Sequence, residues 1–264
     1  METMAILQNG NIARILFGGL KVRILFIRHG DPDYTIDSLT EQGKIEAELL
    51  SQKLSKMKID YIYSSTLGRA IDTASYTLNK LKREADGVYE WLKEFPPLIN
   101  RPDSLDKKIS WDWLPQDWTV ENRFYKKEEW YDVDIMREGK VKEEYCRVVN
   151  EFDKLIEKHG YMRENNIYRV INANDDVIAI FCHFGLTCVL LSHLMGVSPM
   201  VLWHGCCAAP SSVTSVITEE RREGIASFRM NTFGDISHLY IKGEEPSFSA
   251  RFCEMYKNEN ERHD

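Results

Sequence analysis

Cysteine is scarce in this sequence and shows neither disulfide-scaffold nor metal-binding spacing. The 264 residues include six cysteines, and no two of them stand in a CxxC arrangement. A long chain with so few cysteines is not a small domain held together by disulfides, so a reducing compartment is the simpler interpretation.

An excess of positive charge is also lacking. Lysine and arginine number 34 against 41 aspartates and glutamates, which gives a formal net charge of -7. Nucleic-acid binders normally carry a basic surface stripe, so we expect no nucleic-acid partner. An anionic ligand would have to be attracted by a local basic site against the field of the whole protein.

An uninterrupted apolar run long enough for a membrane span is missing as well. Residues 12–27 are apolar, but Arg14, Lys21 and Arg23 cut them into short pieces, and the basic start of a signal peptide is absent. Residues 177–197 approach the roughly 20 apolar residues that a bilayer requires. Two histidines and a glycine interrupt them, however, and their β-branched first half favours a buried strand followed by a core helix. We therefore expect no membrane partner and a cytoplasmic location.

What the sequence does contain is an alternation of apolar strand-like and helix-like segments. Hydrophobic residues make up 43% and charged residues 28%, as in a folded globular protein. Alternating strands and helices predict an α/β fold, a three-layer sandwich with a mostly parallel sheet flanked by helices. The last two strands are separated by a charged turn and could form a hairpin. The expected strands are Val22–Ile27, Asp60–Ser64, Val88–Leu92, Val177–Cys182, Ser212–Ile217 and Ile225–Met230, and the expected helices are Glu41–Met57, Ile71–Leu81, Tyr145–Ile156 and Leu186–Met195.

The alternation stops between Phe95 and Gly139. This aromatic-rich segment, residues 95–140, opens on a proline pair and carries four of the six tryptophans. A segment of this length inside a compact domain is usually functional or has helices of its own. We interpret it as an insertion that packs over a site; the alternative is a small satellite core beneath a surface excursion.

Basic residues, histidines and one acid follow the predicted strands. Arg28 and His29 come after the first strand, Arg69 after the second, Glu94 after the third and His183 after the buried one. Ligands bind at the carboxyl ends of strands in open α/β sheets. Guanidinium groups match phosphate oxygens, and a neutral imidazole can act as a nucleophile, so this set indicates phosphoryl transfer. Taken one by one, such residues are more often structural.

A metal site is a weaker alternative. Cys182, His183, His204, Cys206 and Cys207 are the candidate ligands, but their spacing does not suit tetrahedral zinc. Free cysteine usually behaves as a small buried hydrophobe. We expect no metal and no cofactor.

Four motifs in order resemble those of the histidine phosphatase superfamily, which has the phosphoglycerate mutase-like fold. Residues 25–31 (LFIRHGD) are similar to its RHG signature, and residues 38–43 (SLTEQG) resemble its LTxxG helix start. Residues 64–74 (SSTLGRAIDTA) resemble SSPxxRAxQTA, and residues 182–185 (CHFG) its second histidine motif. One tripeptide is a weak signal, but four motifs in sequence are strong.

The resemblance implies a role for each residue at the strand ends. His29 would be the nucleophile that becomes phosphohistidine. Arg28, Arg69 and His183 would hold the phosphoryl group. Glu94, in a Leu-x-Glu pattern, would donate a proton to the leaving oxygen.

Several positions depart from the family pattern. Thr35 stands where many members have an asparagine that contacts phosphate, and its hydroxyl is expected to replace part of that contact. Phe184 replaces a small residue beside the second histidine, so the pocket there is expected to differ in shape. Glu90 is the nearest competitor of Glu94 for the acid role.

The motifs also divide the chain. We expect an N-terminal extension at residues 1–21, a single histidine phosphatase domain at 22–255 and a charged tail at 256–264. The aromatic-rich segment falls where the family places its variable, substrate-selecting insertion. The oligomeric state stays open.

The resemblance favours a metal-independent phosphatase acting on a small phosphorylated metabolite through phosphohistidine. A phosphoglycerate mutase is the alternative, but acidic residues outnumber basic ones in the aromatic-rich segment, which fits poorly with holding a bisphosphate. A phospho-ligand-binding module without turnover is a second alternative.

Overall fold

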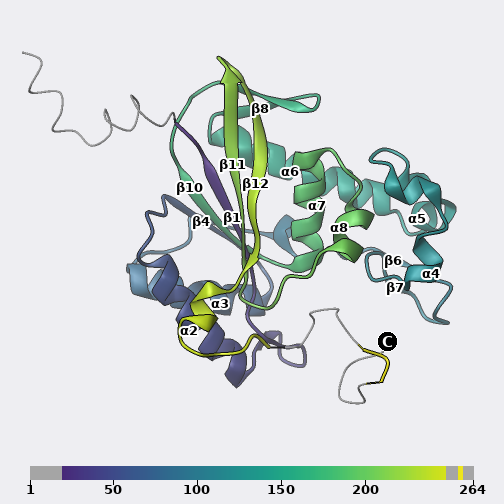
Figure 1. The fold of residues 1–264 in the computed structure, drawn as a ribbon, viewed down its shortest axis with the longest axis horizontal. Helices are drawn as coiled ribbons and strands as arrows, with labels where there is room; N and C mark the ends of the chain where they lie inside the picture. The colour runs from purple at the N-terminus through teal and green to yellow at the C-terminus, as the bar shows by residue number, and fades with distance from the viewer. Residues whose placement is uncertain (1–19, 248–254, 258–264) are drawn as a thin grey trace, which may run out of the picture.

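The computed structural model describes residues 20–247 and 255–257. The expected N-terminal extension therefore lies almost entirely outside the described residues, as does most of the charged tail. Within the described part, eight strands form one sheet in the order β5-β4-β10-β1-β11-β12-β9-β8 (Figure 1). The strands of this sheet are β1 (Arg23–Arg28), β4 (Tyr61–Ser65), β5 (Gly87–Tyr89), β8 (Tyr161–Glu164), β9 (Ile167–Val170), β10 (Val177–Cys182), β11 (Val213–Arg222) and β12 (Ile225–Asp235).

The sheet is parallel in the half that holds the predicted motifs. Strand β1 pairs in parallel with β10, β10 with β4, and β4 with β5. Strand β11 runs against β1 and β12 against β11, so β12 returns to the direction of β1 and forms the expected hairpin with β11. The further hairpin of β8 and β9, which continues the sheet beyond β12, was not predicted.

Helices cover both faces of the sheet, as the alternating side chains of β1 show. Ile24 and Phe26 pack in one cluster with residues of α6 and α7, whereas Leu25 and Ile27 pack in another with residues of α2 and α3. Figure 1 shows the two helix pairs on opposite sides of the sheet. The predicted three-layer α/β sandwich is confirmed. The long helices are α2 (Glu41–Leu54), α3 (Gly68–Leu81), α6 (Val141–Lys158) and α7 (Phe184–Met195), and α8 (Pro199–Gly205) and α9 (Ser237–Tyr240) follow.

Two further features depart from the sequence-based prediction. The expected strand Val88–Leu92 is a strand only up to Tyr89, after which η2 (Glu90–Leu92) forms a turn of 3-10 helix. Residues 177–197 form β10 and α7, as predicted, but the short helix α8 that follows α7 was not predicted. No helix in the described ranges is long and apolar enough to cross a membrane.

The aromatic-rich segment folds into small elements that join the main core. Its Trp113, Phe124 and Trp130 are buried in the same cluster as α6, α7 and the sheet. Trp130 packs edge-on against Trp203 of α8, with ring centroids 5.5 Å apart. The segment is thus continuous with the core, so the satellite-core alternative is wrong. Its elements are β6 (Leu98–Ile99), β7 (Lys108–Ile109), α4 (Pro115–Trp118), η3 (Asn122–Tyr125), η4 (Trp130–Asp132) and α5 (Asp134–Glu138).

Close backbone contact positions the loop after β1. A Cβ on Gly30 would lie 2.8 Å from the carbonyl oxygen of Gly43, and one on Gly43 would lie 2.2 Å from that of Asp31. Thr40 caps α2 by accepting the N–H of Gly43. Only glycine permits this approach, which explains why both motifs contain one.

Candidate active site

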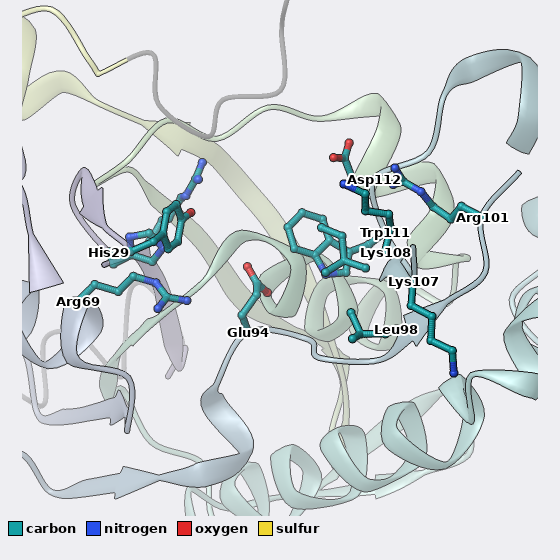
Figure 2. A pocket seen from close by; sticks show the side chains of 12 residues that line it. His29, Arg69, Glu94, Leu98, Arg101, Lys107, Lys108, Trp111 and Asp112 are labelled. Atoms are coloured by element: carbon teal, nitrogen blue, oxygen red, sulfur yellow. The ribbon is translucent and has the colours of Figure 1, made fainter. Parts of the chain in front are cut away.

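The carboxyl ends of β1, β4 and β10 and the turn after η2 bring the predicted residues together. Arg28, His29, Arg69 and Glu94 line one pocket of about 380 Å³ (Figure 2). The ring centroid of His183 lies 5.1 Å from that of His29. Five of the six predicted site residues therefore meet in space.

The protonation of His29 follows from its hydrogen bond. Its Nδ1 lies 2.7 Å from the carbonyl oxygen of Gly30. Because a carbonyl only accepts, Nδ1–H must be the donor, and Nε2 keeps its lone pair. Burial, reinforced by the charges of Arg28 and Arg69, lowers the pKa of His29 well below its usual value. His29 is therefore a neutral imidazole with an unprotonated Nε2, the form that a nucleophile requires.

His183 is also held neutral. Its Nε2 lies 2.9 Å from Oγ of Ser65, and Ser65 Oγ itself accepts the N–H of Leu67. Burial lowers the pKa of His183 well below its usual value, and the nearby His29 and the two arginines lower it further. Nδ1 of His183 is buried and has no hydrogen-bond partner among the described residues.

Two buried arginines provide unsatisfied donors. Arg28 donates to the carbonyl of Ala208 and lies over the ring of Phe184, yet its Nε has no partner within residues 20–247 and 255–257. Arg69 forms an ion pair with Asp37, and its Nε is likewise buried and unpartnered in the described part of the chain. Buried donors are normally hydrogen-bonded, so several unsatisfied ones around a single pocket indicate an anion site.

The side chain of Glu94, a residue that follows η2, lies against the N-terminus of α7. Its carboxylate accepts the N–H groups of Phe95 at 2.9 Å, Leu186 at 2.8 Å and Gly185 at 3.2 Å. Burial raises the pKa of Glu94, and these donors and Arg28 offset only part of the rise. The group is fixed in the pocket and is easier to protonate than an exposed glutamate.

Two residues considered from the sequence lie elsewhere. Glu90 is exposed and pairs with Lys93 and Thr66, which hold its pKa below the usual value. Thr35 is exposed, and its hydroxyl donates to Asp33 at 2.6 Å. Neither residue lines the pocket. The expectation that Thr35 contacts phosphate is corrected, because its own aspartate neighbour occupies the hydroxyl.

Several pocket residues were missed from the sequence. They belong to the loop after β1 or to the aromatic-rich segment and carry no motif. Figure 2 shows most of them across the pocket from His29. They are Tyr34, Leu98, Arg101, Lys107, Lys108, Ile109, Trp111 and Asp112.

The charge expected of this wall is corrected as well. The aromatic-rich segment is acidic as a whole, but among the pocket-lining residues it contributes, three are basic and Asp112 is the acid. Many of its carboxylates face outward and pair with neighbouring cations, such as Glu121 with Arg123 and Asp134 with Arg137. Composition averages over a segment and does not say which charges face the site.

Gly185 permits the contact between Glu94 and the pocket wall. A Cβ there would lie 2.7 Å from Oε1 of Glu94 and 2.8 Å from Trp111. We expect Gly185→Ala to displace both groups and to lower kcat/KM about tenfold to a hundredfold. Gly205→Ala is the matched control, because a Cβ at Gly205 meets nothing within 4 Å. Steady-state kinetics on both variants checks this, and equal activities would contradict it.

A buried carboxyl supports the loop after His29. Glu46 is fully buried and accepts the N–H groups of Asp31 and Ser247. Burial raises the pKa of Glu46 to about 7. Its folded pKa lies above its unfolded value, so the folded protein binds the extra proton between about pH 4.5 and 7.

The free energy of unfolding should therefore fall by about 3 kcal/mol as pH rises through this window. Urea unfolding at pH 5 and pH 7.5 measures the change. Glu46→Gln should remove most of this pH dependence, whereas Glu41→Gln, on the exposed side of the same helix, should keep it. If the free energy of unfolding of Glu46→Gln depended on pH as it does in the wild-type protein, Glu46 would not be the group that titrates.

No group of three or more histidine, cysteine, aspartate or glutamate residues in the described part of the chain is arranged to hold a metal ion. Cys182 and Cys188 are buried, and burial raises the pKa of the Cys182 thiol to about 12.

The sequence pattern of the histidine phosphatase superfamily (branch 1) matches residues 24–231, most of the chain. This chain belongs to the histidine phosphatase superfamily. Its pocket-lining Arg28, His29, Arg69 and Glu94 all fall within the matched residues. A comparison with curated proteins gives no match.

Solved structures share the histidine phosphatase fold with this chain. "Mycobacterial hydrolase 1" is 18% identical over 81% of this chain and 99% of its own, with a TM-score of 0.54. A mycobacterial glucosyl-3-phosphoglycerate phosphatase is 17% identical over the same shares, with a TM-score of 0.53. A phosphoserine phosphatase mutant from Entamoeba histolytica, in complex with phosphoserine, is 18% identical over 83% and 99%, with a TM-score of 0.50. At these identities the likeness shows the fold alone.

Proposed function

We propose that this histidine phosphatase hydrolyses a small phosphorylated metabolite through a phosphohistidine formed on His29, without using a metal. The observation that carries the proposal is the neutral His29, with Nε2 unprotonated, beside the buried unpartnered Nε–H donors of Arg28 and Arg69 and the unpartnered Nδ1 of His183. Those donors suit the oxygens of a phosphoryl group, and the imidazole suits attack on its phosphorus.

In the first step, Nε2 of His29 attacks the phosphorus in line with the ester oxygen. The N–P bond forms as the P–O bond breaks, and protonated Glu94 gives its proton to the departing oxygen. The charge on the transferring group is spread over its oxygens, where the two guanidinium groups and His183 stabilise it. This step yields the alcohol and phosphohistidine.

In the second step, Glu94, now a carboxylate, takes a proton from a water molecule as that water attacks the phosphorus. The N–P bond breaks, and its electron pair returns to Nε2. Inorganic phosphate leaves, and both His29 and Glu94 are restored to their starting states. Each group therefore acts in both halves of the cycle.

A phosphoglycerate mutase is the second candidate, and the basic pocket wall favours it more than the overall composition suggests. Arg101, Lys107 and Lys108 face the same pocket and could retain a second anion. A mutase would need the same phosphohistidine but would pass the phosphoryl group back to substrate. The phosphatase names of two neighbours in the fold support hydrolysis.

The test uses the wild-type protein with a chelator present. It is incubated with p-nitrophenyl phosphate, with a panel of phosphorylated metabolites, and with 3-phosphoglycerate primed by its bisphosphate. Release of inorganic phosphate is the expected result. Isomerisation without phosphate release would replace the proposal with the mutase, and binding without any turnover would replace it with a phospho-ligand-binding module.

A further inference from the structure

The candidate pocket has a second group of charged residues that phosphoryl transfer does not use. Arg101, Lys107 and Lys108 line it together with the residues of the proposed chemistry. Figure 2 shows Glu94 between His29 and Arg69 on one side and the aromatic-rich segment on the other. We call Arg101, Lys107 and Lys108 the basic wall.

Arg101 is held rigidly and still has donors to offer. The residue is only 4% exposed. Its Nε and Nη2 donate to the two carboxylate oxygens of Asp103 at 3.0 and 2.7 Å. Its Nη1 is buried and has no hydrogen-bond partner among the residues that the structure describes. A guanidinium whose Nε and Nη2 are held by a carboxylate and whose Nη1 is unsatisfied is suited to donate hydrogen bonds from Nη1 to an anionic ligand.

Lys108 of β7 and Lys107, which precedes it, add positive charge to the pocket. Neither Lys107 nor Lys108 forms an ion pair with a described residue, whereas Arg123 and Lys126 of the same segment each pair with a carboxylate. Both lysines line the pocket. The three positive charges of the basic wall stand against the carboxylates of Asp103, which pairs with Arg101, and of Asp112, so the local balance stays positive and its field favours a further anion.

Apolar and aromatic groups complete this part of the pocket. Leu98, Ile109 and Trp111 line it beside the basic wall. The indole N–H of Trp111 donates to the carbonyl of Phe95 at 3.0 Å, and this bond fixes the ring. The pocket of about 380 Å³ thus offers a compact surface for a short carbon skeleton between two anion sites.

We propose that the basic wall binds a second anionic group of the substrate, a carboxylate or a phosphate, carried on the same molecule as the phosphoryl group that His29 receives. The inference rests on the proposed function and narrows its substrate class to phosphomonoesters with a second anion. Arg101 anchors that anion, and Lys107 and Lys108 raise the affinity for it.

Three substrates of similar size test the inference. Glycerol 3-phosphate has a neutral end, 3-phosphoglycerate has a carboxylate there, and 1,3-propanediol bisphosphate has a second phosphate. We expect kcat/KM for one of the two doubly anionic compounds to exceed that for glycerol 3-phosphate at least about tenfold. The better of the two identifies the anion, and no preference for either would overturn the inference.

Variants of the basic wall locate the effect. Arg101→Gln, and separately Lys107→Gln with Lys108→Gln, should reduce the preference about tenfold, mainly through KM. The lysine pair is the independent test, because Arg101→Gln also takes the ion-pair partner from Asp103. Arg123→Gln, which removes a surface cation of the same segment, should leave the preference intact. An undiminished preference in both wall variants would overturn the inference.

Hydrolysis of p-nitrophenyl phosphate by the wild-type protein separates the two possible failures. If this compound is hydrolysed but no doubly anionic substrate is preferred, the basic wall is not a substrate site and the proposed function stands. If p-nitrophenyl phosphate and all three esters are inert, the proposed function itself fails.

Discussion

His29→Ala should lower kcat for every phosphomonoester at least about 10⁴-fold, because it removes the atom that forms the intermediate. The other groups around the pocket stabilise charge on the phosphoryl group but cannot replace a nucleophile. Only slow background hydrolysis should remain. The measurement is phosphate release from p-nitrophenyl phosphate at saturating substrate.

The folded state should survive this substitution. The His29 ring makes its hydrogen bond to the neighbouring Gly30 carbonyl, and it lies beyond the end of β1 rather than within the sheet. His193→Asn is the matched control, since His193 of α7 is a partly buried histidine that pairs with Asp153 of α6, outside the pocket. It should keep activity. Full activity in His29→Ala would end the phosphohistidine mechanism.

Trapping of the intermediate gives the same prediction a direct chemical readout. The wild-type protein, quenched in alkali during turnover of a labelled ester, should retain a phosphoryl group whose N–P bond hydrolyses in acid. The His29→Ala variant should retain none. A label stable in acid would place the phosphoryl group on a different kind of side chain.

The strand ends were predictable because burial constrains them so strongly. The apolar runs that become β1 and β10 are covered on both faces, and neighbouring parallel strands must end at the same edge. Arg28, His29 and His183 therefore had to converge. Glu94 was expected after a strand that in fact ends at Tyr89, and a 3-10 turn carries the chain from there towards the pocket, so for this residue only the resemblance was a sound guide.

The opposite wall was not predictable, because nothing periodic governs it. The ion pair with Asp103 holds Arg101 at the pocket. The pairing of β6 with β7, in which Lys108 lies opposite Ile99, positions Lys108. Such contacts have no signature in composition. The prediction that Thr35 contacts phosphate was wrong for a related reason. The Thr35 hydroxyl donates a hydrogen bond to the nearby Asp33, and a position in a motif does not reveal such local competition.

Glu94→Gln should slow alkyl phosphomonoesters far more than p-nitrophenyl phosphate. An alkoxide is a poor leaving group and needs the proton, so we expect a loss of about 10² to 10⁴-fold. The p-nitrophenolate ion leaves readily without protonation, so its ester should lose much less. Glu90→Gln is the matched control, because Glu90 is exposed and ion-paired outside the pocket.

The pH profile provides a second readout for Glu94. A proton donor works only while protonated, so the rate with an alkyl ester should fall as pH rises through the pKa of Glu94. Burial raises that pKa, which places the fall above the range of an exposed glutamate. Glu94→Gln should abolish this descending limb, since an amide does not titrate. If Glu94→Gln slowed the alkyl ester and p-nitrophenyl phosphate equally and left the pH profile unchanged, the proton transfer would belong to another group. A residue that only positions the start of α7 would slow both esters alike.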